Sequence, residues 1–378
     1  MAGRTSAQRA ALERQNAAIM AVFERAGFEQ IAPDIIQPAD IFLERSGEDI
    51  RARTFVFNDP EGQELCLRPD LTVPACRFHL SHAAQPEKEA RYSYLGPAFR
   101  FPDEKLSPQE FTQAGLEWFA AADAVHAEAR ILKLAISALE AAGATGLKIT
   151  LGDVGLFASL LADTHMPTRW RRRLAHQFWR PEAFKNLLHG FATPHSKLRT
   201  SISDVVDLVG DDALTSATAR IDQNNVVMQG TRTTQEIATR LGEKKLDRSE
   251  QPLKPASVET IENYLNIEGG AVEVFAALNA LKAGEAYGQS VAHYQKRLDA
   301  MEEQGLNPKR FFFSANFGRE IEYYTGFVFQ IEAVIGNDVV SLAGGGRYDE
   351  LLSDLGAPTK ISAIGCAIHT ERLAMVLS

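Results

Sequence analysis

Two β-rich hairpins, one near each end of the chain, are the feature that most limits its possible folds. The first spans residues 54–69, where TFVFND and QELCLRP are joined by a turn at Asp59–Gly62. The second spans residues 326–345, where GFVFQIEAVI and DVVSLAGG flank the dipeptide Gly336-Asn337. Because Pro and Gly fix such turns and hairpin strands pair antiparallel, both ends are expected to contribute to an antiparallel sheet.

Helical periodicity dominates the rest of the chain. The spacing of apolar residues predicts a helix over 7–26, with Thr5 or Ser6 as its N-cap and Gly27 as its stop, and another over 121–142. The last segment, SAIGCAIHTERLAMVL, is typical of a buried strand running into a helix. The fold class is therefore α+β.

The domain organisation follows from where this pattern changes. Residues 1–155 and 306–378 are interpreted as two halves of one core, and residues 156–305 as a mostly helical insertion between them. The length of 378 residues, with 45% hydrophobic and 24% charged residues, is ordinary for a globular protein of two or three domains.

Composition excludes several classes of protein. The net charge of −9 argues against a broad surface for polyanions. Cys66, Cys76 and Cys366 form no CxxC pair, so the sequence predicts neither a zinc site nor a disulfide framework, and it predicts no resident cofactor. With no signal-peptide core and no apolar run of about 18 residues, we expect a cytoplasmic protein without a membrane span.

Two short patterns have ordinary interpretations. Gly344-Gly345-Gly346 is not a dinucleotide fingerprint, because Asp349 stands where the third glycine belongs, and by itself it favours a tight turn. The basic run RWRRR at 169–173 favours a solvated helix face or a protein interface over an RNA contact.

Six segments carry a much more specific signal. They are LRPDLTVPACR (67–77), YLGPAFR (94–100), FTQAGLEWF (111–119), GREIEYYTGFVF (318–329), LAGGGRYDELL (342–352) and IGCAIHTERL (364–373). In this order they closely resemble the catalytic core of histidyl-tRNA synthetases, from about residue 8 to 150 and again from about 310 to the end. The resemblance implies a class II synthetase fold, an antiparallel sheet flanked by helices, and a dimer element near Gly27–Pro33.

The resemblance also implies a pocket for free histidine. Such a ligand needs acceptors for its ammonium, partners for both imidazole nitrogens, and a cation or N–H groups for its carboxylate. Asp70 stands where the family usually has Glu, and Arg319 matches the arginine that contacts the substrate carboxylate. The histidine-binding residues implied by the motifs are Asp70, Thr72, Arg100, Gln113, Glu117, Arg319, Tyr323 and Tyr324.

The resemblance is weaker where the family handles ATP. Arg100 and Arg372 match the arginines that hold phosphates, but the loop FPDEKLSPQE (101–110) brings Asp103 and Glu104 where the family has a basic loop. Like charges there are unfavourable for a polyphosphate. His369 replaces a family glycine that lets the nucleotide approach the strand closely.

The tRNA-reading parts of the family are also expected to be lost. The chain ends at Ser378, six residues beyond Arg372, where the family continues with an anticodon-reading domain. The helical insertion, which in the family touches the acceptor stem, matches poorly. Binding of tRNA is therefore not expected.

Retained histidine recognition without ATP handling resembles the regulatory subunits of ATP phosphoribosyltransferase. That family implies a non-catalytic protein that activates the short catalytic subunit in a hetero-octamer, self-associates as a dimer, and transmits feedback inhibition by L-histidine. The alternative is a truncated histidyl-tRNA synthetase-like enzyme that activates histidine with ATP, which retention of Arg319, the family's catalytic arginine, favours. A third hypothesis is a histidine-binding dimer without a partner.

Overall fold

The computed structural model describes residues 3–45, 50, 52–102, 109–178, 180–193, 246–247, 249–318, 323–336 and 338–377. The acidic loop residues Asp103 and Glu104, and the candidate Arg319, lie outside these described residues.

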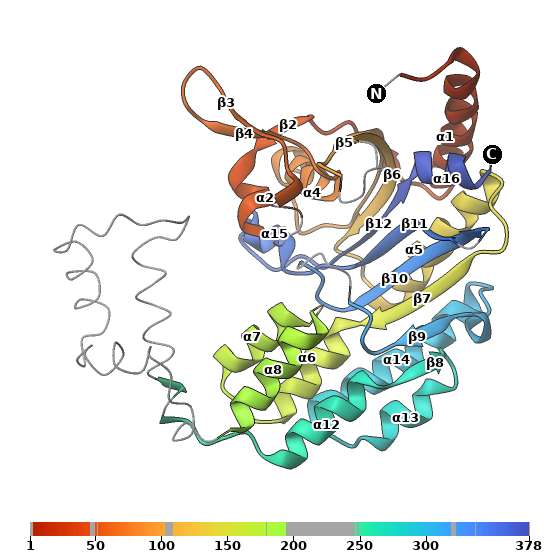
Figure 1. Cartoon of the computed structure of the whole chain (residues 1–378). Coiled ribbons are helices and arrows are strands. Elements are labelled where there is room, and N and C mark those ends of the chain that lie inside the picture. The colour runs from red at the N-terminus through yellow and green to blue at the C-terminus, as the bar shows by residue number, and fades with distance from the viewer. Residues whose placement is uncertain are drawn as a thin grey trace. The chain divides into compact units, whose positions relative to one another are not determined.

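A nine-stranded sheet forms the centre of the larger part of the chain (Figure 1). Its order is β1 (Glu29–Gln30), β5 (Ala90–Phe99), β6 (Glu110–Phe119), β12 (Ala363–His369), β11 (Asp338–Arg347), β10 (Phe327–Ile335), β7 (Lys148–Asp153), β9 (Phe312–Ser314) and β8 (Glu268–Gly270). The β1–β5 and β7–β9 pairs are parallel and all other pairs are antiparallel.

Both halves of the chain contribute strands to this sheet, but of the two predicted hairpins only the second, β10–β11, lies in it. Strand β6 from the first half pairs with β12 from the end, which places Gly365 opposite Glu117 and His369 opposite Gln113. The run Gly344–Gly346 lies inside β11, paired with β10 on one side and β12 on the other. The expectation of a tight turn there is therefore wrong, because these glycines are interior strand residues.

The first predicted hairpin forms a separate small sheet. It contains β3 (Val56–Asn58) and β4 (Glu64–Leu67), and β2 (Ile36–Pro38) pairs with the other edge of β4. The turn between β3 and β4 is closed by a hydrogen bond from the Gly62 N–H to the Asp59 carbonyl oxygen, 3.0 Å long.

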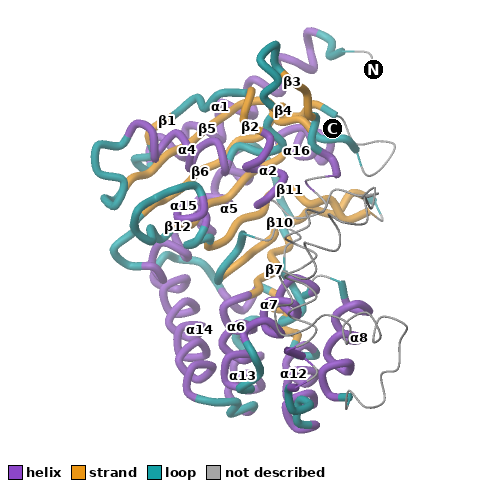
Figure 2. Tube along the Cα trace, turned by 90° about the vertical axis from the view of Figure 1, so that its left-hand side faces the viewer, coloured by secondary structure: helices purple, strands orange, loops and turns teal. Residues whose placement is uncertain are grey.

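Helices pack against these two sheets or against one another. They are α1 (Ser6–Arg25), α2 (Ala39–Arg45), α4 (Thr72–His82), α5 (Ala124–Ala141), α6 (Val154–Asp163), α13 (Val274–Ala280), α14 (Glu285–Glu303), α15 (Leu351–Asp354) and α16 (Thr370–Val376). Helix α1 begins in a capping box between Thr5 and Gln8, and α5 begins at Asp123, which accepts a hydrogen bond from the His126 N–H; the two long helices predicted from the sequence are confirmed. Figure 2 shows β5, β6, β12, β11, β10 and β7 following one another across the sheet.

The chain divides into two compact units, residues 1–163 with 263–378, and residues 164–262. The second unit contains α7 (Thr168–Gln177), α8 (Pro181–Ala192) and most of α12 (Pro255–Leu265). Helix α14, within the segment interpreted as an insertion, belongs to the first unit.

The basic run at 169–173 lies on α7 and is largely engaged within the second unit. Arg169 and Arg173 form ion pairs of 2.7 and 2.6 Å with Asp247. The buried Trp170 ring stacks on Phe191, with centroids 4.3 Å apart. The run therefore serves internal packing as well as the surface.

No helix in the part of the chain that the structure describes is long and apolar enough to span a membrane.

Candidate functional site

A small polar pocket, called here the central pocket, opens where β6, β11 and β12 meet the start of α4. It is lined by Asp70, Thr72, Arg100, Gln113, Tyr323, Tyr324, Gly344, Tyr348, Gly365, Cys366, Ala367 and His369. Six of the eight residues that the sequence nominated are therefore brought together from segments far apart in the chain. Glu117 lies directly beneath the lining, and Arg319 is outside the described residues.

Asp70 places a carboxylate at the start of α4. One oxygen, Oδ1, accepts a hydrogen bond of 3.3 Å from the Val73 N–H. The other, Oδ2, is buried and has no hydrogen-bond partner in the described protein. Burial raises the pKa of the Asp70 carboxyl, and the Arg100 guanidinium opposes that shift. A buried acceptor of this kind is costly unless a donor completes it.

Arg100 and Gln113 are held in place by backbone groups around Asp70. Arg100 donates from Nε to the Pro69 carbonyl oxygen over 2.7 Å, and its guanidinium lies 5.4 Å from the centre of the Phe111 ring. The Gln113 side-chain oxygen accepts from the Leu71 N–H over 2.9 Å, which leaves its amide N–H groups as the donors available to the pocket.

Glu117 forms the floor beneath the pocket. It is fully buried, and its carboxylate accepts hydrogen bonds from the Tyr94 hydroxyl, at 3.0 Å, and from the Tyr348 hydroxyl. Burial raises its pKa to about 8, although the Tyr348, Thr72 and Tyr94 hydroxyls favour the charged form. The carboxyl therefore holds a proton near neutral pH.

Two glycines make room for this floor. A Cβ at Gly365 would lie 1.5 Å from a Glu117 carboxylate oxygen, and a Cβ at Gly115 would lie 2.4 Å from the Tyr94 ring. Both glycines sit directly opposite these side chains on the neighbouring strand. The glycines in FTQAGLEWF and IGCAIHTERL thus allow the Tyr94 and Glu117 side chains to lie across the neighbouring strand.

Tyrosines close one wall of the pocket. The Tyr323 ring packs edge-to-face on Tyr348, with centroids 5.6 Å apart, and lies 5.0 Å from Tyr324. Burial holds the pKa of the Tyr323 and Tyr348 hydroxyls well above the usual range, so both stay neutral. Neutral hydroxyls can donate to one ring nitrogen of an imidazole and accept from the other.

The two residues matched to nucleotide handling differ in their placement. The His369 side chain lines the central pocket, with its ring centre 4.9 Å from that of Phe111. Arg372 is not among the lining residues and donates to the Ser341 carbonyl oxygen over 3.3 Å. An imidazole thus forms part of the pocket wall at this position.

Sequence reasoning missed Tyr348 and Tyr94 as members of the site. Both belong to the quoted motifs, so the segments were found but the hydroxyls were not. The available signal for Tyr94 was a glycine, Gly115, directly opposite it on the neighbouring strand, just as Gly365 lies opposite Glu117. Such pairs become visible only once the register of the strands is known. Within the described residues, no cluster of three or more His, Cys, Asp or Glu side chains could hold a metal ion.

Known proteins share this fold and this sequence. A family model described as histidyl-tRNA synthetase matches residues 3–249 and 244–373. The ATP phosphoribosyltransferase regulatory subunit of Mesorhizobium japonicum is 37% identical over 350 residues, covering 90% of this chain and 91% of the relative. The protein of that name from Rhizobium leguminosarum bv. trifolii is 35% identical over 373 residues, covering 94% and 97%.

Solved structures agree on the fold. An ATP phosphoribosyltransferase regulatory subunit/histidyl-tRNA synthetase from Bacillus halodurans C superposes with a TM-score of 0.72 at 19% identity, covering 100% of this chain and 82% of the other. Histidyl-tRNA synthetase from Nostoc sp. PCC 7120 gives 0.63 at 15% identity, covering 98% and 72%.

The sheet and the family model thus define a class II synthetase-like protein related to histidyl-tRNA synthetases, which confirms the expected fold class. Within that class, the chain belongs to the ATP phosphoribosyltransferase regulatory subunit family, since it matches such subunits over at least nine-tenths of its length.

Proposed function

We propose that this chain activates a short-form ATP phosphoribosyltransferase catalytic subunit and senses L-histidine in the central pocket. It has no catalytic role of its own, and the phosphoribosyl transfer takes place in the partner. It works in the cytoplasm as a dimer within a hetero-octamer. Feedback inhibition then requires that histidine bind the inhibited assembly more tightly than the active one, by about 1–3 kcal/mol for a typical allosteric coupling.

The buried Asp70 Oδ2, which has no partner in the described protein, is the observation that carries the ligand assignment. A protonated α-ammonium supplies the donors that this oxygen lacks, and it favours the charged form of a carboxyl whose pKa burial raises. The Arg100 guanidinium, on the same pocket wall, offers a charge for the α-carboxylate.

The neutral tyrosines support an imidazole as the side chain of the ligand. Tyr323 and Tyr348 line the pocket, and the Tyr348 hydroxyl, which donates to Glu117, can still accept from an imidazole N–H. Glu117 behind it can give up or retain a proton as the tautomer requires. An aliphatic side chain could form no hydrogen bond in this polar pocket, which disfavours it.

The regulatory assignment over aminoacyl activation is supported by His369. The His369 side chain would obstruct a nucleotide sterically, because its imidazole lies on the pocket wall beside Phe111, where a nucleotide would pass the strand. Arg372 turns to the Ser341 carbonyl oxygen. Neither feature obstructs an amino acid bound at Asp70.

Reconstitution with the short catalytic subunit tests the proposal. Phosphoribosyl transfer should rise on mixing, and L-histidine should inhibit the mixture. The Tyr323→Phe variant, which removes one buried hydroxyl, should require roughly 5–10-fold more histidine for half inhibition, since a neutral hydrogen bond contributes about 1 kcal/mol. Glu140→Gln, which changes an exposed carboxyl on α5, is the matched control. The mixture that contains it should be inhibited by the same histidine concentration as the wild type.

Two results would overturn the assignment. Histidine-dependent pyrophosphate exchange by the purified chain would establish the alternative, an enzyme that activates histidine with ATP. A mixture that gains no transferase activity would favour a histidine-binding dimer without this partner.

A further inference from the structure

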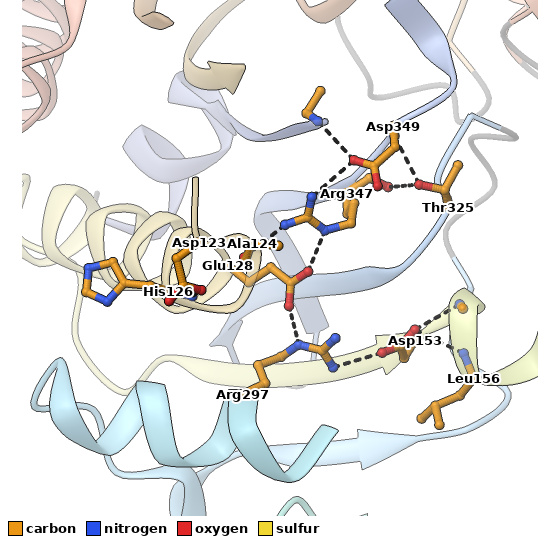
Figure 3. Close-up of polar contacts among 12 residues, drawn as sticks. Asp123, Ala124, His126, Glu128, Asp153, Leu156, Arg297, Thr325, Arg347 and Asp349 are labelled. Atoms are coloured by element: carbon orange, nitrogen blue, oxygen red, sulfur yellow. Dashed lines mark hydrogen bonds and ion pairs between the residues drawn. The ribbon is translucent and has the colours of Figure 1, made fainter. Parts of the chain in front are cut away.

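A chain of buried charges runs from the helices into the strand that precedes Tyr348 (Figure 3). The Glu128 carboxylate on α5 accepts from Arg297 Nε on α14 and from Arg347 Nε at the end of β11, both at 2.5 Å. Arg297 also forms an ion pair of 2.8 Å with Asp153 on β7. Glu128, Arg297 and Arg347 are all at least nine-tenths buried.

Arg347 makes more contacts than the ion pair with Glu128. Its Nη2 donates to the Ala124 carbonyl oxygen over 2.9 Å, and its Nη1 donates to Asp349 Oδ1 over 3.1 Å. Asp349 Oδ1 also accepts from the Ala363 N–H over 2.9 Å. One guanidinium therefore joins the first turn of α5 to both sides of Tyr348, as the sticks in Figure 3 show for Arg347, Ala124 and Asp349.

The same short segment holds the tyrosine wall. The Arg347 carbonyl oxygen accepts from the Thr325 N–H over 2.8 Å, and the Thr325 hydroxyl accepts from the Asp349 N–H over 3.0 Å. Thr325 directly follows Tyr323 and Tyr324. Residues 347–349 thus anchor the segment that carries two pocket residues, and they contain a third, Tyr348.

We propose that Arg347 is a positioning residue for the central pocket: through Glu128, Ala124 and Asp349 it fixes the Tyr348 hydroxyl on Glu117 and the wall formed by Tyr323 and Tyr324. It touches no ligand and acts only through these neighbours. The predicted effect of Arg347 on histidine affinity rests on the proposed function, whereas its predicted effect on the position of the Tyr348 side chain does not.

The chemistry of the side chain makes the role specific to arginine. A guanidinium presents several N–H groups in a rigid plane, so it satisfies a carboxylate, a carbonyl and a second carboxylate at fixed angles. Lysine keeps the charge but offers a single flexible nitrogen, which cannot hold all three partners at once. Arg347→Lys therefore keeps the positive charge but removes the fixed geometry of the three contacts, so it tests the positioning role apart from the charge.

The far end of the same network provides a matched control. Asp153 Oδ2 pairs with Arg297, while its Oδ1 accepts from the Gly155 and Leu156 N–H groups. Asp153→Asn removes a buried charge and keeps the Oδ1 acceptor, yet it touches no residue of 347–349. A purely structural role of the network would make both variants behave alike.

The experiment measures two quantities on the full-length chain, under conditions where each variant is fully folded. The dissociation constant for L-histidine should rise at least 10-fold in Arg347→Lys and less than 3-fold in Asp153→Asn. The ¹⁹F resonance of 3-fluorotyrosine incorporated at position 348, recorded without ligand, should shift or broaden in Arg347→Lys only. Thr325→Val, which removes the hydroxyl bound to Asp349, should raise the dissociation constant about 3–10-fold and serves if Arg347→Lys does not fold.

Equal changes in Arg347→Lys and Asp153→Asn, or an unchanged ¹⁹F resonance in Arg347→Lys, would overturn the proposal, as would unchanged affinity in Thr325→Val. A wild-type chain that binds no histidine would contradict the proposed function instead, and the ¹⁹F comparison would still decide the role of Arg347.

Discussion

Two buried glutamates in the same compact unit have opposite electrostatics. Glu117 on β6 is surrounded by hydroxyls, and burial raises its pKa to about 8. For Glu128 on α5, burial alone would raise the pKa, but the Arg297 and Arg347 guanidiniums outweigh it and hold the pKa below the usual range. The comparison shows that one buried carboxyl is a permanent charge in a structural network, whereas the other can exchange a proton beneath the central pocket.

The largest expected effect comes from breaking the charged network. Glu128→Ala leaves the Arg297 and Arg347 guanidiniums without their shared carboxylate, and a buried charge that loses its partner costs about 3–5 kcal/mol. Urea denaturation should report this loss in the free energy of unfolding. A loss below about 1 kcal/mol would contradict the view that Glu128 holds the network together.

The pH dependence of stability should separate the two glutamates. The Glu117 pKa is about 8 in the folded chain against 4.5 in the unfolded chain, so the folded state binds the proton more tightly. Its contribution is fully present below pH 4.5 and is lost as pH rises through about 8, at up to roughly 1.4 kcal/mol per pH unit in between.

Glu117→Gln is the control for this dependence, because a neutral amide of similar shape does not titrate there. Unfolding in urea at pH 6 and at pH 8.5 should show a difference for the wild type that is smaller in Glu117→Gln by a few kcal/mol. Identical pH dependence in the two proteins would mean that Glu117 does not hold a proton in the folded state.

A methyl group at Gly365 should disturb the floor of the pocket by sterics alone. Its Cβ would lie 1.5 Å from Glu117 Oε2 and 2.6 Å from the Leu116 carbonyl oxygen. Overpacking of this kind costs about 1–3 kcal/mol in stability. Gly190→Ala, on α8, has open space around its Cβ and is the matched control. Equal thermal stability of the Gly365→Ala and Gly190→Ala variants would contradict the tight packing at Glu117.

The smallest effect concerns a single hydroxyl. Tyr348→Phe removes one donor to Glu117 and should cost about 1 kcal/mol at neutral pH. Because that hydroxyl favours the charged carboxylate, its loss should also move the pH at which stability declines upward. A downward shift, measured by the same urea series, would reverse the assigned role of the hydroxyl.

Much of the site was predictable from sequence, because it consists of motifs in a fixed order. The helices α1 and α5 and the two hairpins were predictable, because helix caps, turns and apolar periodicity depend on residues that are close together in the sequence. The resemblance brought Asp70, Gln113 and the tyrosine pair to one pocket.

The rest depends on contacts between residues distant in the chain. Glu128 and Arg347 are 219 positions apart, and no local pattern indicates their pairing. The glycine run 344–346 was misread as a turn because its cause, paired strands on both sides, is a property of the assembled sheet. The role of Tyr348 followed only from its hydrogen bond to Glu117, which lies 231 positions away in the chain.

Calorimetric titration of L-histidine into the wild type, Asp70→Asn and Glu140→Gln tests the central claim most directly. The wild type and Glu140→Gln should bind alike, and Asp70→Asn should bind about 10–150-fold more weakly, since a charge-assisted hydrogen bond contributes roughly 1.5–3 kcal/mol. Equal affinity in all three would contradict a histidine ammonium held by the buried Asp70 carboxylate.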